Sequence, residues 1–96
     1  MKTDVELLES AAKAVGITER VAPGVFWGVD GAIWSPLTDD GDALRLAVVC
    51  CLPLDIEDYQ TLVQPLGICE PHGTDAYLAT RRAIVRAAAV IGELAA

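Results

Sequence analysis

The run 38-TDDGDALRLAVVCC-51 carries the pattern that decides the fold of this chain. Its first part, Thr38–Asp42, is typical of a helix start, because short polar side chains accept hydrogen bonds from free backbone N–H groups and carboxylates suit the positive end of the helix dipole. In the segment that follows, Ala43–Cys51, Arg45 is the only charged residue. A helix that is apolar on all sides usually lies at the centre of a domain, so we expect this helix to form the buried core. A strand over Leu46–Leu52 is the alternative, and it fits the start signals less well.

Two further helices are predicted near the ends of the sequence. Thr3 and Glu6 have the spacing of a capping box, and the apolar periodicity after them extends from about Asp4 to Val15. Gly16 follows as a typical C′ residue, because glycine adopts the left-handed conformation without strain. The last helix is expected from about Asp75 to Leu94, with an apolar stripe at 7-4-3-4 spacing. The stripe consists of Tyr77, Ile84, Ala88, Ile91 and Ala95.

A first β-hairpin is predicted between the first two helices. The runs Val25–Val29 and Ala32–Trp34 are rich in β-branched and aromatic residues and flank the pair Asp30-Gly31. That pair favours a hairpin with a type I′ turn, which needs positive φ at both central residues. Val21–Gly24 is predicted to be a loop.

A second hairpin is predicted between the central and the last helix. Leu54–Tyr59 begins with the alternation of a half-buried strand, and Gln60–Gly67 is expected to return beside it. Pro65 would confine the returning strand to a sheet edge. Cys69–Gly73 is predicted to be a loop. The expected order is therefore α-β-β-α-β-β-α, an α+β fold in which a small antiparallel sheet of two hairpins packs with three helices.

The composition limits the classes of partner. Acidic residues outnumber basic ones by 14 to 7, which gives a net charge of −7. Such a chain repels polyanions, so we expect no direct contact with nucleic acid or an anionic membrane. Apolar residues make up 53% of the 96 residues, too many for a disordered chain, and the length favours a single domain over residues 1–96. The partner that we expect is a protein with a basic surface.

No targeting or membrane segment is expected. The stretch Met1–Glu9 is polar and charged, without the apolar centre of a signal peptide. The longest apolar run, Leu46–Leu54, is shorter than the ~18–20 residues that span a bilayer. We therefore expect a cytoplasmic protein.

Two stretches carry a resemblance to a known group of sequences. They are 34-WSPLTDDGDALRL-46 and 79-ATRRAIVRAAA-89, supported by Leu7-Leu8 and Ala11-Ala12-Lys13-Ala14. Over the outer helices and the central motif the chain resembles short proteins encoded by phages and prophages of proteobacteria. No activity is established for that group, so the resemblance implies a phage context and a bacterial host cytoplasm rather than a chemistry. In that group charged or polar residues often stand where this chain has Cys50 and Cys51, so a cysteine-based role would belong to this chain alone.

The cysteines and the single histidine are weak candidates for a chemical site. Cys50 and Cys51 are adjacent, and adjacent helical residues point about 100° apart, so they rarely bind one zinc ion. Cys69 and His72 could be drawn as nucleophile and base, but spacing supplies neither hydrogen-bond contact nor an orienting third group, and His72 is expected in a solvated loop. An odd number of cysteines is a poor disulfide framework. We expect no enzymatic activity, no cofactor, no bound metal and no structural disulfide, and we rank a cysteine- or zinc-dependent activity last.

Three groups of residues are candidates for contact with a partner. The acidic group consists of Asp39, Asp40, Asp42, Asp55, Glu57 and Asp58. Its first three members are also explained as a helix start, and the others extend the patch only if the fold brings them close. Arg82 and Arg86 share a helix face, which is either a contact site or a solvated surface paired with acids. Trp34 is expected to pack on the central helix, whereas Trp27 would be a hot-spot candidate if exposed.

Two functions from different classes remain open. The first is a non-enzymatic phage accessory protein that binds a host or phage protein through its acidic face, as a host-takeover or anti-defence inhibitor such as an anti-CRISPR protein does. The second is a structural or self-associating phage or prophage protein without an inhibitory target.

Overall fold

Residues 2–94 form an α+β fold in the computed structural model, and these are the residues that the structure describes. The helices are α1 (Asp4–Val15), α2 (Asp40–Val49) and α3 (Ala76–Leu94). One antiparallel sheet consists of β1 (Arg20–Ala22), β2 (Val25–Trp27) and β3 (Ile33–Trp34), and the other of β4 (Leu54–Ile56), β5 (Gln60–Val63) and β6 (Ile68–Pro71). The predicted α+β class is confirmed, with two separate three-stranded sheets in place of one sheet of two hairpins.

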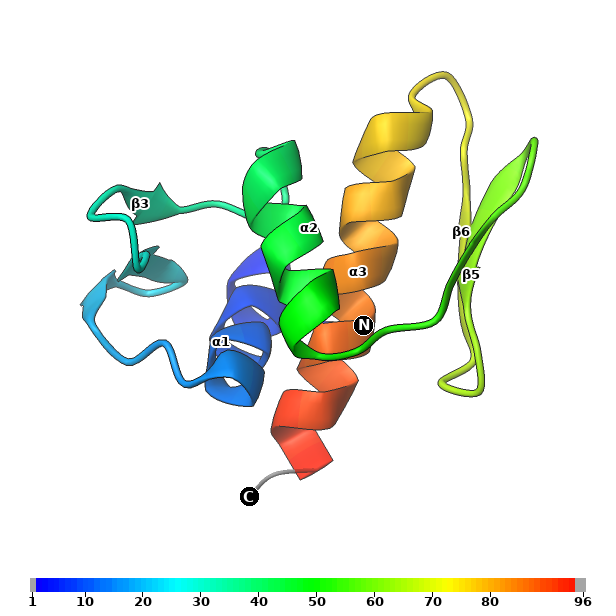
Figure 1. The fold of residues 1–96 in the computed structure, drawn as a ribbon. Helices are drawn as coiled ribbons and strands as arrows, with labels where there is room; N and C mark the ends of the chain where they lie inside the picture. Colours follow the sequence, from blue (N-terminus) through cyan, green and yellow to red (C-terminus); the bar gives the residue numbers. More distant parts are fainter. Residues whose placement is uncertain (1, 95–96) are drawn as a thin grey trace.

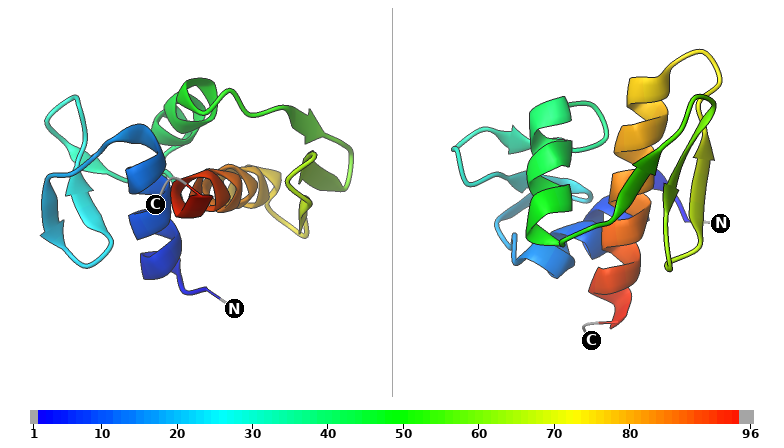
Figure 2. Two further views of the ribbon diagram at one scale, coloured as in Figure 1. Left: turned by 90° about the horizontal axis from the view of Figure 1, so that it is seen from below. Right: turned by 45° about the vertical axis from the view of Figure 1, so that its right-hand side comes forward.

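The helix α3 lies at the centre of the molecule (Figure 1). It packs against α1, α2, β5 and β6, and the two sheets lie on opposite sides of the helices (Figure 2). Its buried residues serve two hydrophobic clusters. Val85 and Ala88 belong to the cluster shared with α1, α2 and the first sheet, whereas Ala83 and Ala87 pack with Val63 of the second sheet.

Small side chains let α1 and α3 approach each other closely. Alanines of both helices, among them Ala12 and Ala88, are at most 1% exposed and belong to one core cluster. Further along α3, a methyl group added at Gly92 would lie 1.8 Å from the carbonyl oxygen of Ser10. The two backbones therefore meet without room for a side chain between them.

The ends of α1 are capped as the sequence predicts. The Thr3 hydroxyl accepts a hydrogen bond from the Glu6 backbone N–H at 3.2 Å, and the Glu6 carboxylate accepts from the Thr3 N–H at 3.0 Å. At the other end Gly16 has a φ of 73°, and the Ile17 N–H donates to the Ala12 carbonyl at 3.0 Å. The predicted bounds of this helix are confirmed.

Glu9 ties the first sheet to α1. Its Oε2 accepts hydrogen bonds from the Gly24 N–H at 2.7 Å and from Arg20 Nε at 2.9 Å. These contacts, the Gly24 bond foremost, hold the pKa of the Glu9 carboxyl below its usual range. Gly24 has a φ of 73°, and a Cβ at this position would lie 3.2 Å from Val5 Cα, so the turn needs glycine both for its conformation and for its close contact with α1.

The first sheet confirms the predicted hairpin but corrects its turn. Phe26 pairs with Trp34 across β2 and β3, and their rings lie edge to face with centroids 6.0 Å apart. In the connecting loop Gly31 alone has a positive φ, so the predicted type I′ turn is wrong. The Gly28 N–H donates to the Ala32 carbonyl at 2.7 Å, which leaves a longer loop that needs a single left-handed residue.

Two segments predicted as loops contain strands. The predicted loop Val21–Gly24 overlaps β1, and the predicted loop Cys69–Gly73 overlaps β6. Both are outer strands that form by pairing with one neighbouring strand, so neither needs a clear apolar alternation of its own. β5 is the central strand of its sheet, not the predicted edge. It ends before Pro65, which therefore removes no ladder hydrogen bond.

The helix α2 is not the buried core that its composition predicts. Its exposed apolar residues are Leu44, Val48 and Val49, and its buried ones are Ala43, Leu46 and Ala47. Because α2 lies on the outside of α3 (Figure 1), its neighbours cover only one of its faces. The expectation that the whole segment Ala43–Cys51 is core is therefore wrong. The helix also ends earlier than predicted, with Cys50 as its C-cap.

The helix α3 confirms the predicted last helix. Asp75 caps it, since its Oδ1 accepts a hydrogen bond from the Leu78 N–H at 3.0 Å. Ile84 of the predicted stripe is buried, but Tyr77 is 73% exposed because no described element packs over that side of the first turn. Ala95 lies outside the described residues. Although α3 is the longest helix, no helix within residues 2–94 is long and apolar enough to cross a membrane.

Replacing Gly92 by alanine should lower the free energy of unfolding by about 1–3 kcal/mol, the usual cost of overpacking. The overlap with Ser10 has to outweigh the ~1 kcal/mol that alanine gains over glycine inside a helix. Urea denaturation measures the difference, and Leu94→Ala, at a position 79% exposed, serves as the control with little expected change. A Gly92→Ala variant as stable as the parent would show that the two helices do not meet here.

Leu46→Ala and Leu44→Ala should separate the two faces of α2. Leu46 is 2% exposed, so its truncation should cost about 2–5 kcal/mol. Leu44 is 61% exposed, so the same change should alter stability by less than about 0.5–1 kcal/mol. Both variants make one chemical change in one helix, so thermal or urea melts compare burial alone. Equal losses would contradict the exposure of the outer face.

Candidate functional site

An apolar groove lies along the exposed face of α2. Its volume is about 340 Å³, and it is bounded by α2, the loop between β2 and β3, and the C-terminal end of α1. We call it the α2 groove. Its apolar lining includes Val15, Ile17, Val29, Leu44, Val48 and Val49.

The apolar residues of the α2 groove are unusually exposed for their type. Val29, at the tip of the hairpin, is 93% exposed, and Leu44, Val48 and Val49 are each more than 60% exposed. A single exposed apolar side chain is ordinary. Several that gather around one concave surface are typical of a contact site, because covering them removes apolar area from water.

Carboxylates surround the basic residue of the groove lining, Arg45. Its Nη2 donates to Asp42 Oδ1 at 2.6 Å. This hydrogen bond, followed by the negative charges of Asp42, Asp30 and Asp39, raises the pKa of the Arg45 guanidinium against the opposing effect of desolvation. The charged lining residues Asp30, Asp42 and Arg45 have a net charge of −1, and Asp39 adds negative charge nearby. The tertiary structure has brought Asp30 of the hairpin beside the start of α2.

The first three predicted acidic residues are engaged in the fold. Asp39 caps α2, since its Oδ2 accepts a hydrogen bond from the Asp42 N–H at 2.8 Å. Asp42 is buried, and its Oδ2 accepts from the Ser35 N–H at 2.8 Å. Asp40 forms an ion pair with Arg81 at 2.7 Å. Their explanation as a helix start is thus supported, and of the three only Asp42 lines the groove.

The other three predicted acidic residues lie elsewhere. Asp55, Glu57 and Asp58 lie in β4 or just after it, which Figure 1 draws on the other side of α3 from α2. Glu57 accepts a hydrogen bond from Gln60 Nε2 at 2.7 Å. Asp55 and Asp58 are exposed, and their carboxylates have no ion-pair or hydrogen-bond partner within residues 2–94. The structure therefore separates the six acids into two groups.

The tryptophans have opposite environments. Trp34 is 7% exposed and contributes to the floor of the α2 groove. It therefore shapes the groove, but it is not an exposed anchor for a partner. Trp27 is 46% exposed and lies outside the groove lining. The predicted packing of Trp34 next to the central helix agrees with its place in the same core cluster as Leu46.

In the structure Arg82 and Arg86 each pair with an acidic residue from another element. Arg86 Nη1 donates to Glu70 Oε2 of β6 at 2.5 Å, and Arg82 Nη1 donates to Asp4 Oδ1 at 2.9 Å. Both arginines line a pocket separate from the α2 groove. They are thus partly paired with acids, as expected of a surface cluster, but they also line a cavity.

The cysteines and the histidine do not meet in one site. Cys69 Sγ donates to Gln60 Oε1 at 3.2 Å, whereas His72 Nε2 shares a hydrogen bond of 2.8 Å with Thr61 Oγ1. His72 is 9% exposed, so its predicted place in a solvated loop is wrong. Thr61 also bonds Thr80 of α3 at 2.8 Å, which makes a buried polar network between the second sheet and α3. Within the described part of the chain no group of three or more His, Cys, Asp or Glu residues is placed to hold a metal ion.

The sequence pattern does not predict the α2 groove, because a helix that is apolar on all sides is expected to be buried on every side. One signal was present: Ala43 and Ala47, four residues apart, mark a face of small side chains for close packing, while Leu44 and Val48 lie on another face. Val29 gave no such signal, because it belongs to the predicted strand Val25–Val29, whereas β2 ends at Trp27 and Val29 lies in the turn after it. No family model, no curated protein and no solved structure matches this chain.

Cys51 and Cys69 should react with iodoacetamide several-fold faster than Cys50. The first two are exposed, whereas burial, with a smaller effect of Cys51, raises the pKa of the Cys50 thiol and so lowers the amount of reactive thiolate. Mass spectrometry of Cys50→Ser and Cys51→Ser variants, sampled over time at fixed pH, resolves the adjacent pair. If Cys50 reacts as fast as Cys51, its side chain is not packed on the core.

Proposed function

We propose that this chain is a non-enzymatic accessory protein that acts by binding another protein through the α2 groove. The resemblance to short phage and prophage proteins supports a bacterial host cytoplasm as the place of action and a host or phage protein as the partner. In that setting the bound chain acts as a host-takeover or anti-defence inhibitor.

The observation that carries the proposal is the outward-facing apolar side of α2. Fully burying an aliphatic side chain contributes about 1.5–3 kcal/mol relative to leaving it exposed. Leu44, Val48 and Val49 retain more than 60% of their exposed area, so a partner that covers them gains several such contributions. The helix is already held in place by the buried Leu46, so little ordering is needed on binding.

The charge of the groove indicates which kind of partner segment fits it. The charged residues of the groove lining, Asp30, Asp42 and Arg45, have a net charge of −1, and the chain as a whole has −7. A segment with apolar side chains flanked by lysine or arginine complements this surface and is steered toward it. A second copy of the chain would bring a like-charged rim to the same contact, so self-association is the less favourable use of the groove.

The test compares what the immobilised parent and two double variants capture from a bacterial lysate. Leu44→Ser with Val48→Ser removes the apolar face of the groove at positions that the fold leaves exposed. Ile56→Ser with Tyr59→Ser changes one residue of β4 and one of the turn after it, which are 61% and 69% exposed, and is the matched control. We expect one partner to bind the parent and the control, and to bind the groove variant at least about tenfold more weakly, since central apolar contacts each contribute roughly 1–2 kcal/mol.

Further variants of the same experiment locate the contact if the partner does not bind in the α2 groove. Equal capture by the parent and the groove variant, with unchanged melting curves, contradicts the proposal. Loss of the partner only in Asp55→Asn with Glu57→Gln, together with weaker association at higher salt, assigns the contact to the acidic residues around β4. A dimer in sedimentation that the groove variant abolishes favours the self-associating alternative.

A further inference from the structure

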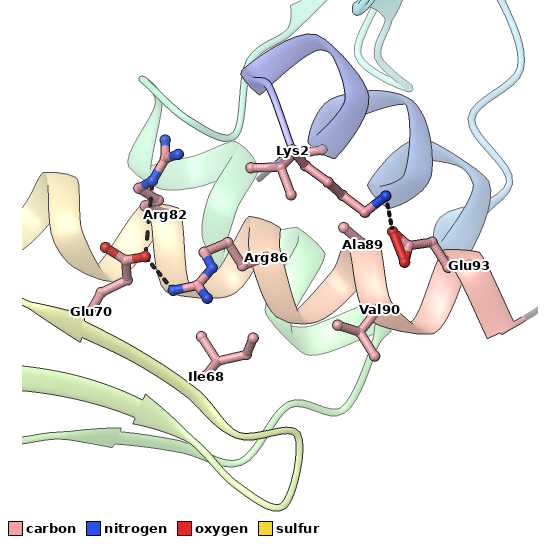
Figure 3. A pocket seen from close by; sticks show the side chains of 9 residues that line it. Lys2, Ile68, Glu70, Arg82, Arg86, Ala89, Val90 and Glu93 are labelled. Atoms are coloured by element: carbon pink, nitrogen blue, oxygen red, sulfur yellow. Dashed lines mark hydrogen bonds and ion pairs between the residues drawn. The ribbon is translucent and has the colours of Figure 1, made fainter.

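A second pocket lies between the start of α1, β6 and the C-terminal half of α3 (Figure 3). It shares no lining residue with the α2 groove. Its volume is about 470 Å³, within the ~300–1,000 Å³ of small-molecule sites. We call it the arginine pocket, because Arg82 and Arg86 line one side. Its other charged lining residues are Lys2, Glu70 and Glu93.

The floor of the arginine pocket is apolar and preformed. Leu7 of α1 and Ile68 of β6 are each 6% exposed, and Ala89 of α3 is 1% exposed. Figure 3 shows Ile68, Ala89 and Val90 beside the charged side chains. Since these residues come from three elements that pack on one another, a ligand meets an apolar surface that needs no rearrangement.

The two arginines leave most of their hydrogen-bond donors unused. Arg86 Nη1 donates to Glu70 Oε2 at 2.5 Å and to the Cys69 carbonyl at 3.3 Å, and Arg82 Nη1 donates to Asp4. The Nε of Arg82 lies 3.9 Å from Glu70 Oε2, beyond hydrogen-bond reach. Within residues 2–94, Nε and Nη2 of both side chains have no hydrogen-bond acceptor. A guanidinium presents its donors as a planar fork that matches a carboxylate, so both arginines offer a free edge.

The charge of the lining favours a single negative charge on the ligand. Three positive and two negative side chains line the pocket, a net charge of +1 in a chain of −7. Asp4, which pairs with Arg82 from outside the lining, is 63% exposed and is therefore screened by water. A polyphosphate would meet the repulsion of the whole chain, whereas a monoanion neutralises the lining.

We infer that the arginine pocket binds a small monocarboxylate with an apolar body, such as a medium-chain fatty acid. The carboxylate lies against the free guanidinium edge of Arg86, the positive charge of Arg82 lies on the far side of Glu70 (Figure 3), and the hydrocarbon part lies over Leu7, Ile68 and Val90. The ion pair between Lys2 and Glu93, 2.8 Å long, closes the far end (Figure 3). This site is independent of the protein contact at the α2 groove.

Titration of the isotope-labelled full chain with octanoate, followed by methyl and amide NMR, tests this site. Octanoate should saturate one site and shift the methyl signals of Ile68, Ala89 and Val90. Octylammonium, which has the same chain length and the opposite charge, should bind at least tenfold more weakly. Arg86→Lys keeps the charge but loses the planar fork and should weaken octanoate binding about tenfold. Arg20→Lys, the matched change at an ion-paired arginine that lines neither pocket, should leave it unchanged.

Three results would overturn the assignment. Methyl shifts confined to Leu44, Val48 and Val49 would place octanoate in the α2 groove. Equal affinity for octanoate and octylammonium would remove the role of the arginines. Octanoate shifts that never saturate below its solubility limit would show that no site exists. The methyl shifts are measured on the parent chain, so the outcome does not depend on whether the variants fold.

Discussion

Two helix backbones meet where Gly92 of α3 passes the carbonyl group of Ser10 in α1, with no space between them for a methyl group. This contact requires small residues along both helices, and the alanines of the shared core supply them. Alanine loses no side-chain entropy on burial, so the close approach gains dispersion contacts at little entropic cost. Once α1 and α3 are fixed in this way, the remaining faces of α3 are the surface on which α2 and the second sheet must pack.

The helix α3 can act as this centre because its side chains are small on several sides. Its buried residues are Ala79, Ala83, Ile84, Val85, Ala87, Ala88, Ala89 and Gly92. Neighbours therefore pack against it on several sides at short range, while Arg82, Arg86 and Glu93 keep part of its surface charged. By contrast α2 has alanines on one face only, so it packs close to α3 on that face and leaves Leu44, Val48 and Val49 outside. The α2 groove is a direct consequence of which helix takes the centre.

The two concave surfaces that remain have unlike chemistry. Arg82 and Arg86 are drawn to acids of α1 and β6, which gathers positive charge on the side of α3 away from the groove. At the groove, Asp30 and the acids that start α2 surround a single arginine. In a chain of net charge −7 this separation gives one apolar surface with an acidic rim and one apolar pocket with a basic side. The ligands that we propose for them, a basic protein segment and a small carboxylate, therefore differ, and neither proposal depends on the other.

The sequence by itself determined the features that depend on neighbouring residues along the chain. The capping box of Thr3 and Glu6, the bounds of the first and last helices and the existence of the first hairpin all follow from interactions within a few residues, so a pattern in the sequence suffices to find them. The α+β class followed from the same local patterns, and the helix-start role of Asp39 and its neighbours did too. The candidate site was predicted only in part, since these acids reach the rim while the groove itself was not foreseen.

Only the tertiary structure decided which apolar helix is covered, because burial depends on what packs from distant parts of the chain. The outward position of Leu44 and Val48 and the burial of His72 against Thr61, eleven residues away, both depend on such packing. The same holds for the pairing of Arg86 with Glu70 and for the arrival of Asp30 beside Arg45. Composition records how much apolar surface and charge a chain has, but the packing of α1 on α3 determines which apolar and charged residues face the solvent.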